Sequence, residues 1–468
     1  MVRTELARVA MLHYAFEVTQ SITRSSPEDF HCRRKRIAER LARENAALLI
    51  YGGDLKTRSN DSDFGFRPDS NFYYLSGLAE PGAIMFLTGE QNGELTLFVR
   101  PRDPVAETWS GRRVGPEGAQ QRFGAHRAFP LQVVSDELPE LLDGKSRIYA
   151  SLGQYPEFDR LIFTAQTNLR RRNRDGTIVP ETIVHLDDIL AEDRMIKDTA
   201  ALACLRHAIH ISATAHRETM ACVKPGMTEF QLQAELEYHF RYAGSEGPGY
   251  SSIVAGGDNA TILHYVENSM GLKDGELVLI DAGAEWDYFT GDITRTFPVN
   301  GKFNDTQRQL YSLVLAANEA GIAACTPGQT IDGVHQICVD ILCQGLLDLG
   351  ILKGSLAEIK DKELYKKYYM HRSSHWLGID VHDAGSYCID RKPRPFAENY
   401  VLTVEPALYI RKNDESVAPE FRGIGIRIED DVRVTHESPE VLSSEVPKSI
   451  SAIEALIAES SDSNQRSS

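Results

Sequence analysis

Acidic residues inside apolar, strand-like runs are the feature that most constrains this chain. The segment ELVLIDAGAEWDYFTGDITRTF predicts two strands joined by a tight turn near residues 285–288, with Asp281 ending the first strand and Asp292 on the returning strand. If the hairpin closes about Trp286, the two aspartates face each other and repel unless a proton or a cation lies between them. The segment therefore predicts a cation site, and the alternative is that one aspartate caps a turn and the other is solvated.

Two glutamates repeat the pattern in later strand-like runs. NYVLTVEPALYI places Glu405 among Val, Leu, Thr and Tyr, and GIGIRIEDDVRVT alternates isoleucine with small and charged residues before Glu429. A buried, isolated carboxylate is strongly destabilising, so each glutamate needs a partner. Arg427 lies two residues before Glu429 on the same strand face and is one candidate partner. Because one arginine cannot satisfy four acids, shared metal ions account better for the set.

Histidines supply the nitrogen ligands that such a site can use. NATILHYVEN contains His264, and YMHRSSHWLGIDVHDAG contains His371, His375 and His382. The spacing of the first two histidines in the second segment matches the zinc-protease helix, but Arg372 occupies the position where that motif needs its glutamate base. Four carboxylates with one or two imidazoles form a hard, oxygen-rich ligand set, which favours Mn²⁺, Mg²⁺ or Fe²⁺ over a thiolate zinc site.

Composition excludes several classes of partner. The chain has 51 basic and 67 acidic residues and a formal net charge of -16, which argues against nucleic acid and anionic membranes. No segment approaches the roughly 18 consecutive apolar residues of a membrane span. The seven cysteines are odd in number, widely spaced and without a CxxC pair. They predict reduced core thiols and a cytoplasmic protein.

The chain of 468 residues is long enough for two domains. Short apolar runs alternate with turns and helical segments in its first part, as in α/β proteins, and long helices mix with strands in its second part, as in α+β proteins. We expect a flexible extension over residues 1–26, an α/β domain over 27–190, an α+β domain over 191–446, and the end of a C-terminal helix with a disordered tail over 447–468.

The acids and one histidine occur in an order that resembles a known family. They stand in LIDAG, GDITRTFPVNGKF, SHWLGIDVHD, TVEPALYI and RGIGIRIEDD, and the pattern is similar to the dinuclear metallopeptidases of the pita-bread fold, above all the Xaa-Pro aminopeptidases. Upstream, TRSNDSDFGFRPDSNFYYLSGLAEPGA and ETWSGRRVG look like the N-terminal domain of that family. The resemblance implies an α+β protein, with a pita-bread catalytic domain that follows a smaller α/β domain of the creatinase/aminopeptidase P type.

The resemblance also implies a cofactor and a set of site residues. The cofactor would be two divalent ions, most commonly Mn²⁺, that activate a bridging hydroxide. The implied metal ligands are Asp281, Asp292, His375, Glu405 and Glu429, of which the second and the last would bridge the ions. The implied catalytic groups are Glu405 as proton shuttle, with His264, His371 and His382 beside the substrate or the intermediate. The residues implied to support the ligands or touch the substrate are Arg427, Tyr409 and Trp109.

The implied substrates are peptides with proline at the second position, cleaved before the proline, and the implied assembly is a homodimer or homotetramer. Alternatives are a prolidase, which cleaves only Xaa-Pro dipeptides, a non-catalytic binding protein on the same fold, and a metal-free creatinase-like hydrolase. All five implied ligands are present, which disfavours the last two. For Trp109, the alternative is an ordinary, partly buried aromatic residue.

Three residues depart from the wording that is usual in this family. Arg372 and Ser373 follow His371 where a glycine usually comes directly after the histidine, and Ala407 replaces a glycine after Glu405-Pro406. A glycine at the first position could serve a special backbone angle or leave room for substrate. The departures therefore bear on substrate range and turnover and leave the metal ligands untouched.

Overall fold

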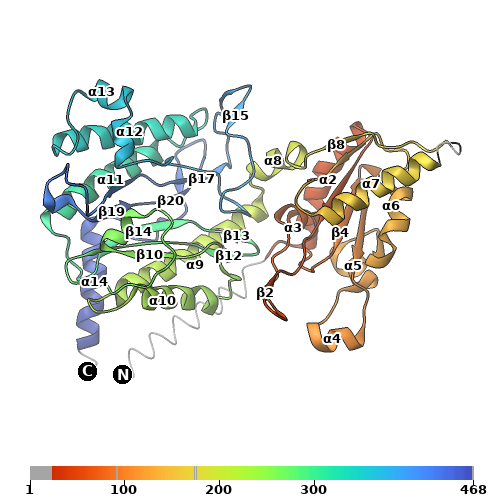
Figure 1. The fold of residues 1–468 in the computed structure, drawn as a ribbon, viewed down its shortest axis with the longest axis horizontal. Coiled ribbons are helices and arrows are strands. Elements are labelled where there is room, and N and C mark those ends of the chain that lie inside the picture. Colours follow the sequence, from red (N-terminus) through yellow and green to blue (C-terminus); the bar gives the residue numbers. More distant parts are fainter. Residues whose placement is uncertain (1–23, 91–92, 173, 175, 466–468) are drawn as a thin grey trace. The chain divides into compact units, whose positions relative to one another are not determined.

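The computed structural model describes residues 24–90, 93–172, 174 and 176–465, and it divides them into two compact units (Figure 1). One unit spans residues 25–194, and the other contains Arg24 and the chain from Met195 onward. Most of the extension expected over residues 1–26 lies outside the described residues. The expected fold class is confirmed, because a smaller α/β unit precedes a larger unit that mixes helices with antiparallel strands.

The N-terminal unit is built on one mixed six-stranded sheet. In spatial order its strands are β6 (Arg127–Pro130), β5 (Leu95–Val99), β4 (Ile84–Thr88), β1 (Ala46–Tyr51), β7 (Arg147–Tyr149) and β8 (Thr182–Val184). Its helices are α2 (Pro27–Arg43), α3 (Ser70–Ser76), α4 (Pro104–Ser110), α5 (Gly115–Phe123), η2 (Leu131–Val133), α6 (Val134–Leu142), α7 (Pro156–Arg171) and α8 (Asp187–Met195), and a small hairpin joins β2 (Thr57–Ser59) to β3 (Ser62–Asp63).

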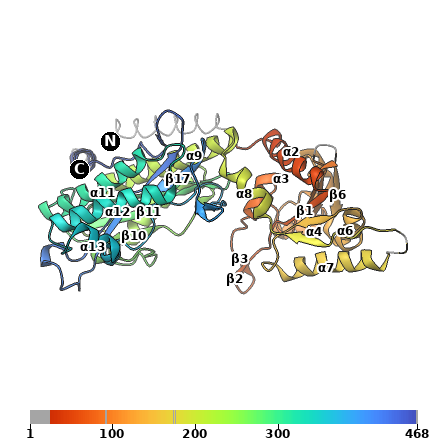
Figure 2. The same ribbon diagram turned by 90° about the horizontal axis from the view of Figure 1, so that it is seen from above.

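The two faces of this sheet are covered by different helices. Helix α2 lies on one side of the strands and α7 on the other (Figure 2). Buried residues of α6 and α7, such as Leu138 and Ile162, form one apolar cluster with Leu49 and Phe86 of the sheet. Helix α2 begins with a capping box, in which the Ser26 hydroxyl accepts from the backbone of Asp29 at 3.3 Å, and the carboxylate of that residue accepts from the Ser26 backbone at 2.7 Å.

The C-terminal unit places antiparallel strands between two layers of helices (Figure 1). Its helices are α9 (Thr199–Cys222), α10 (Glu229–Tyr242), η4 (Gly257–Thr261), α11 (Asp305–Ala323), α12 (Ile331–Asp348), α13 (Leu356–Asp361), η5 (Leu364–Lys367), η6 (Pro419–Phe421) and α14 (Ile450–Gln465). Its strands are β9 (Gly247–Pro248), β10 (Ile253–Gly256), β11 (Leu277–Ala282), β12 (Ala284–Trp286), β13 (Phe289–Thr290), β14 (Ile293–Pro298), β15 (Cys388–Ile389), β16 (Lys392–Pro393), β17 (Val401–Val404), β18 (Ala407–Ile410), β19 (Ile424–Arg427), β20 (Asp430–Arg433) and β21 (Glu440–Val441).

The aspartate hairpin forms as predicted, with a register that the sequence did not reveal. Strand β11 pairs with β14, and Trp286 lies opposite Phe289 across a turn whose central residues have φ of 54° and 64°. Asp281 lies opposite Thr294, so Asp292 is its diagonal neighbour on the same face, and the expectation that the two aspartates are directly opposed is wrong. The reason is the position of the turn: two residues, 287 and 288, separate Trp286 from Phe289, and the same register continued along the strands pairs Asp281 with Thr294.

Both glutamates lie at breaks between strands, which corrects their expected place within strands. Glu405 falls between β17 and β18, where Pro406 has no N–H to continue a ladder. Glu429 falls between β19 and β20, and a single bridge pairs it with Thr294. At a break the carboxylate can turn away from the regular pleat and toward the groups of neighbouring strands.

The structure also bears on the predicted absence of a membrane span, on the cysteines and on the C-terminal tail. Among the described residues, none of the helices is both long and apolar enough to cross a membrane. All seven cysteines are free thiols, but Cys32 and Cys388 are exposed and do not belong to a core. The polar tail expected to be disordered is helical as far as Gln465, because Ile453 and Ile457 are buried one turn apart and anchor α14.

Candidate metal centre and active site

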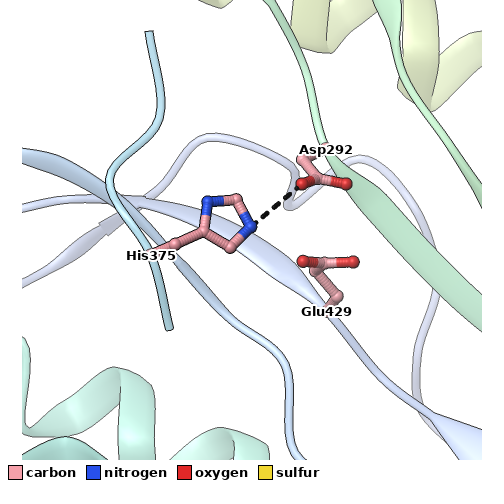
Figure 3. Close-up of side chains that lie close together, drawn as sticks. All are labelled: Asp292, His375 and Glu429. Carbon is pink, nitrogen blue, oxygen red and sulfur yellow. Dashed lines mark ion pairs between the residues drawn. The ribbon is translucent and has the colours of Figure 1, made fainter. Parts of the chain in front are cut away.

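Three predicted ligands from distant parts of the chain meet in the C-terminal unit. Asp292, His375 and Glu429 each offer one ligand atom, and these atoms lie within 4.8 Å of one another (Figure 3). The aspartate comes from the end of the hairpin, the histidine from the irregular segment before β17, and the glutamate from the β19–β20 break. All three side chains point toward a common centre, as a metal ion would require.

Hydrogen bonding fixes the orientation of His375. Its Nδ1 donates to the carbonyl of Trp376 at 3.0 Å, which leaves Nε2 facing the acids, 3.3 Å from Asp292 and 3.9 Å from Glu405. Burial opposes a charge on the ring, but the two carboxylates outweigh it and raise the pKa of His375 to about 9. The position of Nε2 therefore attracts a proton, and it would attract a metal cation for the same reason.

The remaining aspartate is held by two groups. Arg427 donates to Asp281 at 2.5 Å, and the hydroxyl of Tyr250 lies 2.7 Å from the same carboxylate and 2.5 Å from Asp292. Burial raises the pKa of Asp281, and Arg427 opposes that rise. Arg427 therefore pairs with Asp281, and the suggestion that it pairs with Glu429 is wrong. The hydroxyl of Thr294 donates to Glu429 instead, at 2.6 Å.

The acids of this centre carry more negative charge than the buried cationic partner can offset. Burial raises the pKa of Glu405 to about 7, and burial together with Asp292 raises the pKa of Glu429 well above its ordinary value. Arg427 contacts only Asp281 among the four acids. Carboxylate oxygens with one imidazole match the ligands of hard divalent cations, so the residues present fit a metal centre.

Two of the three other predicted histidines, His371 and His382, lie beside this group. His371 donates through Nδ1 to the carbonyl of Arg372 at 2.7 Å and accepts through Nε2 from the Tyr409 hydroxyl at 2.9 Å. Burial lowers the pKa of His371 to about 3, and it also lowers the pKa of His382, whose ring centroid lies 4.2 Å from that of His375. His264 is exposed, and its proximity contributes to lowering the pKa of His371 and His382.

Tyr409 and Arg427, the two residues that the resemblance implied as support, are linked by a hydrogen bond. The Arg427 guanidinium donates to the Tyr409 hydroxyl at 2.8 Å, and that hydroxyl donates onward to His371. Trp109, by contrast, lies on α4 of the N-terminal unit with 87% of its side chain exposed, so it is not the partly buried aromatic of the alternative reading.

Three site residues escaped the sequence analysis. Tyr250 precedes β10 in a segment without any periodic pattern, so no sequence signal marked it. Thr294 lies in the alternating run after Asp292, and its place on the same strand face is a signal that could have found it. Asp431 is fully buried and accepts from the Asp292 backbone at 3.1 Å, and it stands in the same acid-rich run as Glu429.

The departures from the family wording lie beside the centre. Arg372 is not among the described residues with positive φ, so its backbone does not demand glycine. Its side chain is 63% exposed and pairs with Asp332 of α12 at 2.8 Å. Ser373 is buried, and its hydroxyl lies 2.8 Å from Nδ1 of His335. Ala407 pairs with Arg427 in the β18–β19 hairpin.

Comparisons with known proteins cover nearly the whole chain. The model of metallopeptidase family M24 matches residues 203–436, and that of the aminopeptidase P N-terminal domain matches residues 30–149. The chain is 40% identical over 434 residues to the Xaa-Pro aminopeptidase of Escherichia coli, covering 92% of this chain and 98% of that protein. It is 34% identical over 421 residues to Xaa-Pro aminopeptidase 3 of Rattus norvegicus, covering 88% of this chain and 81% of that protein.

Solved structures agree with these matches. The aminopeptidase PepP of Pseudomonas aeruginosa superposes with a TM-score of 0.91 at 42% identity, covering 94% of this chain and 99% of that one. A zinc-substituted E. coli aminopeptidase P in complex with product superposes with a TM-score of 0.90 at 40% identity, covering 94% and 99%. The chain therefore belongs to the Xaa-Pro aminopeptidases of metallopeptidase family M24, metal-dependent hydrolases that release an N-terminal residue preceding proline.

Proposed function

We propose that this chain releases the first residue of Xaa-Pro peptides with two divalent ions, preferably Mn²⁺, held by the five predicted ligands. The ligand set is Asp281, Asp292, His375, Glu405 and Glu429, with Asp292 and Glu429 shared between the ions. The observation that carries this proposal is the meeting of Asp292, His375 and Glu429 within 4.8 Å around an excess of buried negative charge. Two such ions would acidify a water molecule and offset the negative charge that develops on the substrate.

Glu405 is the group proposed to move the proton. Its Oε2 lies 3.6 Å from His371 Nδ1, and its Oε1 lies 3.9 Å from His375 Nε2. Burial raises the pKa of Glu405 to about 7. A carboxyl group near neutrality accepts a proton from water and returns it to a leaving amine most efficiently. Beside bound cations Glu405 would be held in the carboxylate form, so it would act as base first and as acid once it holds the proton.

The histidines are proposed to bind the reacting peptide. His371 is neutral because burial lowers its pKa to about 3, and its hydrogen bond from Tyr409 fixes the ring. His264 and His382 are exposed, and in this proposal they donate to a substrate carbonyl or to the oxyanion that replaces it. The acidic centre suits the ammonium group of a peptide N-terminus.

Hydrolysis of matched peptides tests the activity. The metal-stripped enzyme is assayed on a tripeptide Xaa-Pro-Yaa and on the dipeptide Xaa-Pro, with Mn²⁺, Mg²⁺, Zn²⁺ or no metal added. We expect Mn²⁺-dependent release of Xaa from the tripeptide. Cleavage of the dipeptide alone would make the protein a prolidase, and metal analysis of the active form would show whether two ions are bound per subunit.

Two properties of the protein in the cell complete the proposal. We propose a cytoplasmic location, which the free cysteines support because exposed thiols persist in a reducing compartment. We also propose a homodimer or homotetramer, as family resemblance implies. Light scattering coupled to size-exclusion chromatography measures the assembly, and a monomeric mass at micromolar concentration would contradict it.

A further inference from the structure

The loop that carries His264 is tied to one buried carboxylate. Glu229 is the first residue of α10 and is fully buried. Each of its carboxylate oxygens accepts two hydrogen bonds. The donors to Oε1 are Gly256 N–H and Asn259 Nδ2, both at 2.8 Å, and the donors to Oε2 are the Tyr265 hydroxyl at 2.9 Å and Met270 N–H at 2.8 Å.

These four bonds are the main compensation for the charge of Glu229. All four donors to this carboxylate are neutral groups: two backbone N–H groups, an amide and a hydroxyl. Its place in the first turn of α10 adds the favourable field of a helix N-terminus. Hydrogen bonds from neutral donors to a charged acceptor are stronger than neutral ones. All four donors come from the segment 256–270, so this one carboxylate closes the whole loop.

The four hydrogen bonds to Glu229, here called the clamp, hold the part of the loop that carries His264. The ring of Tyr265 is buried in a cluster with Ile253, Ala255 and Leu279, and its hydroxyl donates a hydrogen bond to Glu229. The preceding residue, His264, is exposed, and it is one of the histidines proposed above to bind the reacting peptide. Fixing the ring of Tyr265 therefore fixes the backbone from which the imidazole of His264 extends.

A second tie holds the same loop independently of Glu229. Asn268 accepts from Val254 N–H at 3.0 Å and donates to the carbonyl of Ser252 at 2.8 Å and to Gln233 at 2.9 Å. When the carboxylate is altered, this tie keeps the loop attached to β10 and α10. A change at Glu229 should then loosen the loop without unfolding the unit.

We infer that Glu229 is a positioning residue, which holds the imidazole of His264 at the substrate through the loop 256–270. This inference rests on the proposed role of His264 in catalysis. Glu229 touches neither the predicted metal ligands nor the substrate, and its effect on turnover passes through Tyr265 and the loop backbone.

The substitution Glu229→Gln tests the clamp with almost no change in size. The amide NH₂ replaces an acceptor that two donors share, so at least one N–H loses its partner and is opposed by another donor. We expect kcat on Xaa-Pro-Yaa to fall by about 10- to 100-fold, since small misplacements of catalytic groups have effects of this size. The bound metal content should stay unchanged. Glu235→Gln on the same helix is the matched control, because its carboxylate is 39% exposed and contacts only His239.

A double-mutant cycle separates positioning from general destabilisation. In the His264→Ala background, adding Glu229→Gln should cause no further loss of kcat, because the group that the clamp positions is gone. An equal loss in both backgrounds would overturn the inference. Full activity of His264→Ala alone would overturn both the proposed role of His264 and this inference. Impaired His264→Ala beside normal Glu229→Gln would overturn the inference alone.

Tyr265→Phe is a milder variant in case Glu229→Gln does not fold. It removes one of the four bonds and keeps the ring in its apolar cluster. We expect a smaller loss of kcat, again absent in the His264→Ala background, together with faster amide hydrogen exchange over residues 256–270 in the otherwise intact holoenzyme. Unchanged exchange and unchanged kcat would contradict the clamp.

Discussion

Substituting Asp292 by Asn removes the charge at the point where the predicted ligands converge. The carboxylate lies 3.3 Å from His375, 2.5 Å from the Tyr250 hydroxyl and within 4.8 Å of a Glu429 oxygen. Asparagine keeps the shape and one oxygen, so the substitution tests charge and ligation more than packing. We expect hydrolysis of Xaa-Pro-Yaa peptides to be abolished at ordinary metal concentrations.

The size of the effect follows from the field at His375. The nearby carboxylates raise the pKa of His375 from 6.5 to about 9, which corresponds to an attraction of about 3 kcal/mol for a single positive charge. Asp292 supplies the larger part of that attraction, since it also bonds the ring. A divalent ion feels the same field at least as strongly, so the loss of Asp292 should weaken metal binding by about 100-fold or more.

The assay measures Mn²⁺ binding by calorimetry and turnover in the same preparation. Asp274→Asn is the control, because Asp274 is exposed in the turn before β11 and contacts only Asn300. Turnover of Asp292→Asn that stays near normal, with metal still bound, would refute the assignment of Asp292 as a shared ligand. Lost turnover with unchanged metal affinity would refute the electrostatic reasoning.

Three further predictions concern residues around the centre. Arg372→Gly should change the ratio of the kcat/KM values for peptides with an acidic first residue and for peptides with a basic one. The free energy of unfolding should change by less than about 1 kcal/mol, because the ion pair of Arg372 with Asp332 is exposed. Kinetics identical to those of the unsubstituted enzyme on all such peptides would contradict this prediction. The folded pKa of His375 is raised to about 9, so its contribution to stability is complete below pH 6.5 and is lost as pH rises through 9. The metal-free protein should therefore lose about 2 kcal/mol between pH 7 and 9 in urea titrations, and the Mn²⁺-loaded protein should not. Lys197→Met should lower the free energy of unfolding by about 3–5 kcal/mol, because it breaks a buried ion pair with Asp383, 2.7 Å away; an unchanged midpoint in urea titrations would contradict it.

The sequence predicted the members of the centre better than their connections. Asp292 and Glu429 could be singled out because acids rarely occur inside apolar strand-like runs without a partner, whereas the choice of His375 among four histidines came from the family resemblance. The contact between Arg427 and Asp281 joins residues 146 positions apart. It depends on how the two hairpins pack, which no local pattern encodes.

The same limit applies to strand register and to irregular segments. Alternation indicated that Asp281 and Asp292 share a face, but the diagonal offset arises from the exact place of the two-residue turn at 287–288, which the sequence located only approximately. Glu405 was predicted inside a strand because its neighbours are β-formers, and Pro406 ends the ladder there. Tyr250 could not be predicted at all, since its role comes only from the two carboxylates that reach its hydroxyl.

His371 and His375 are four residues apart, and their neighbouring groups, not their spacing, determine the chemical role of each ring. His375 faces Asp292 and Glu405, and those carboxylates raise its pKa to about 9. His371 is as buried, but burial and the charge of Arg427 lower its pKa to about 3. The first ring therefore offers a nitrogen where positive charge is favoured, as a metal ligand must, and the second is kept neutral as a hydrogen-bonding group. Both lie in an irregular segment between η5 and β17, so the helical spacing that resembled a zinc-protease motif has no structural counterpart here.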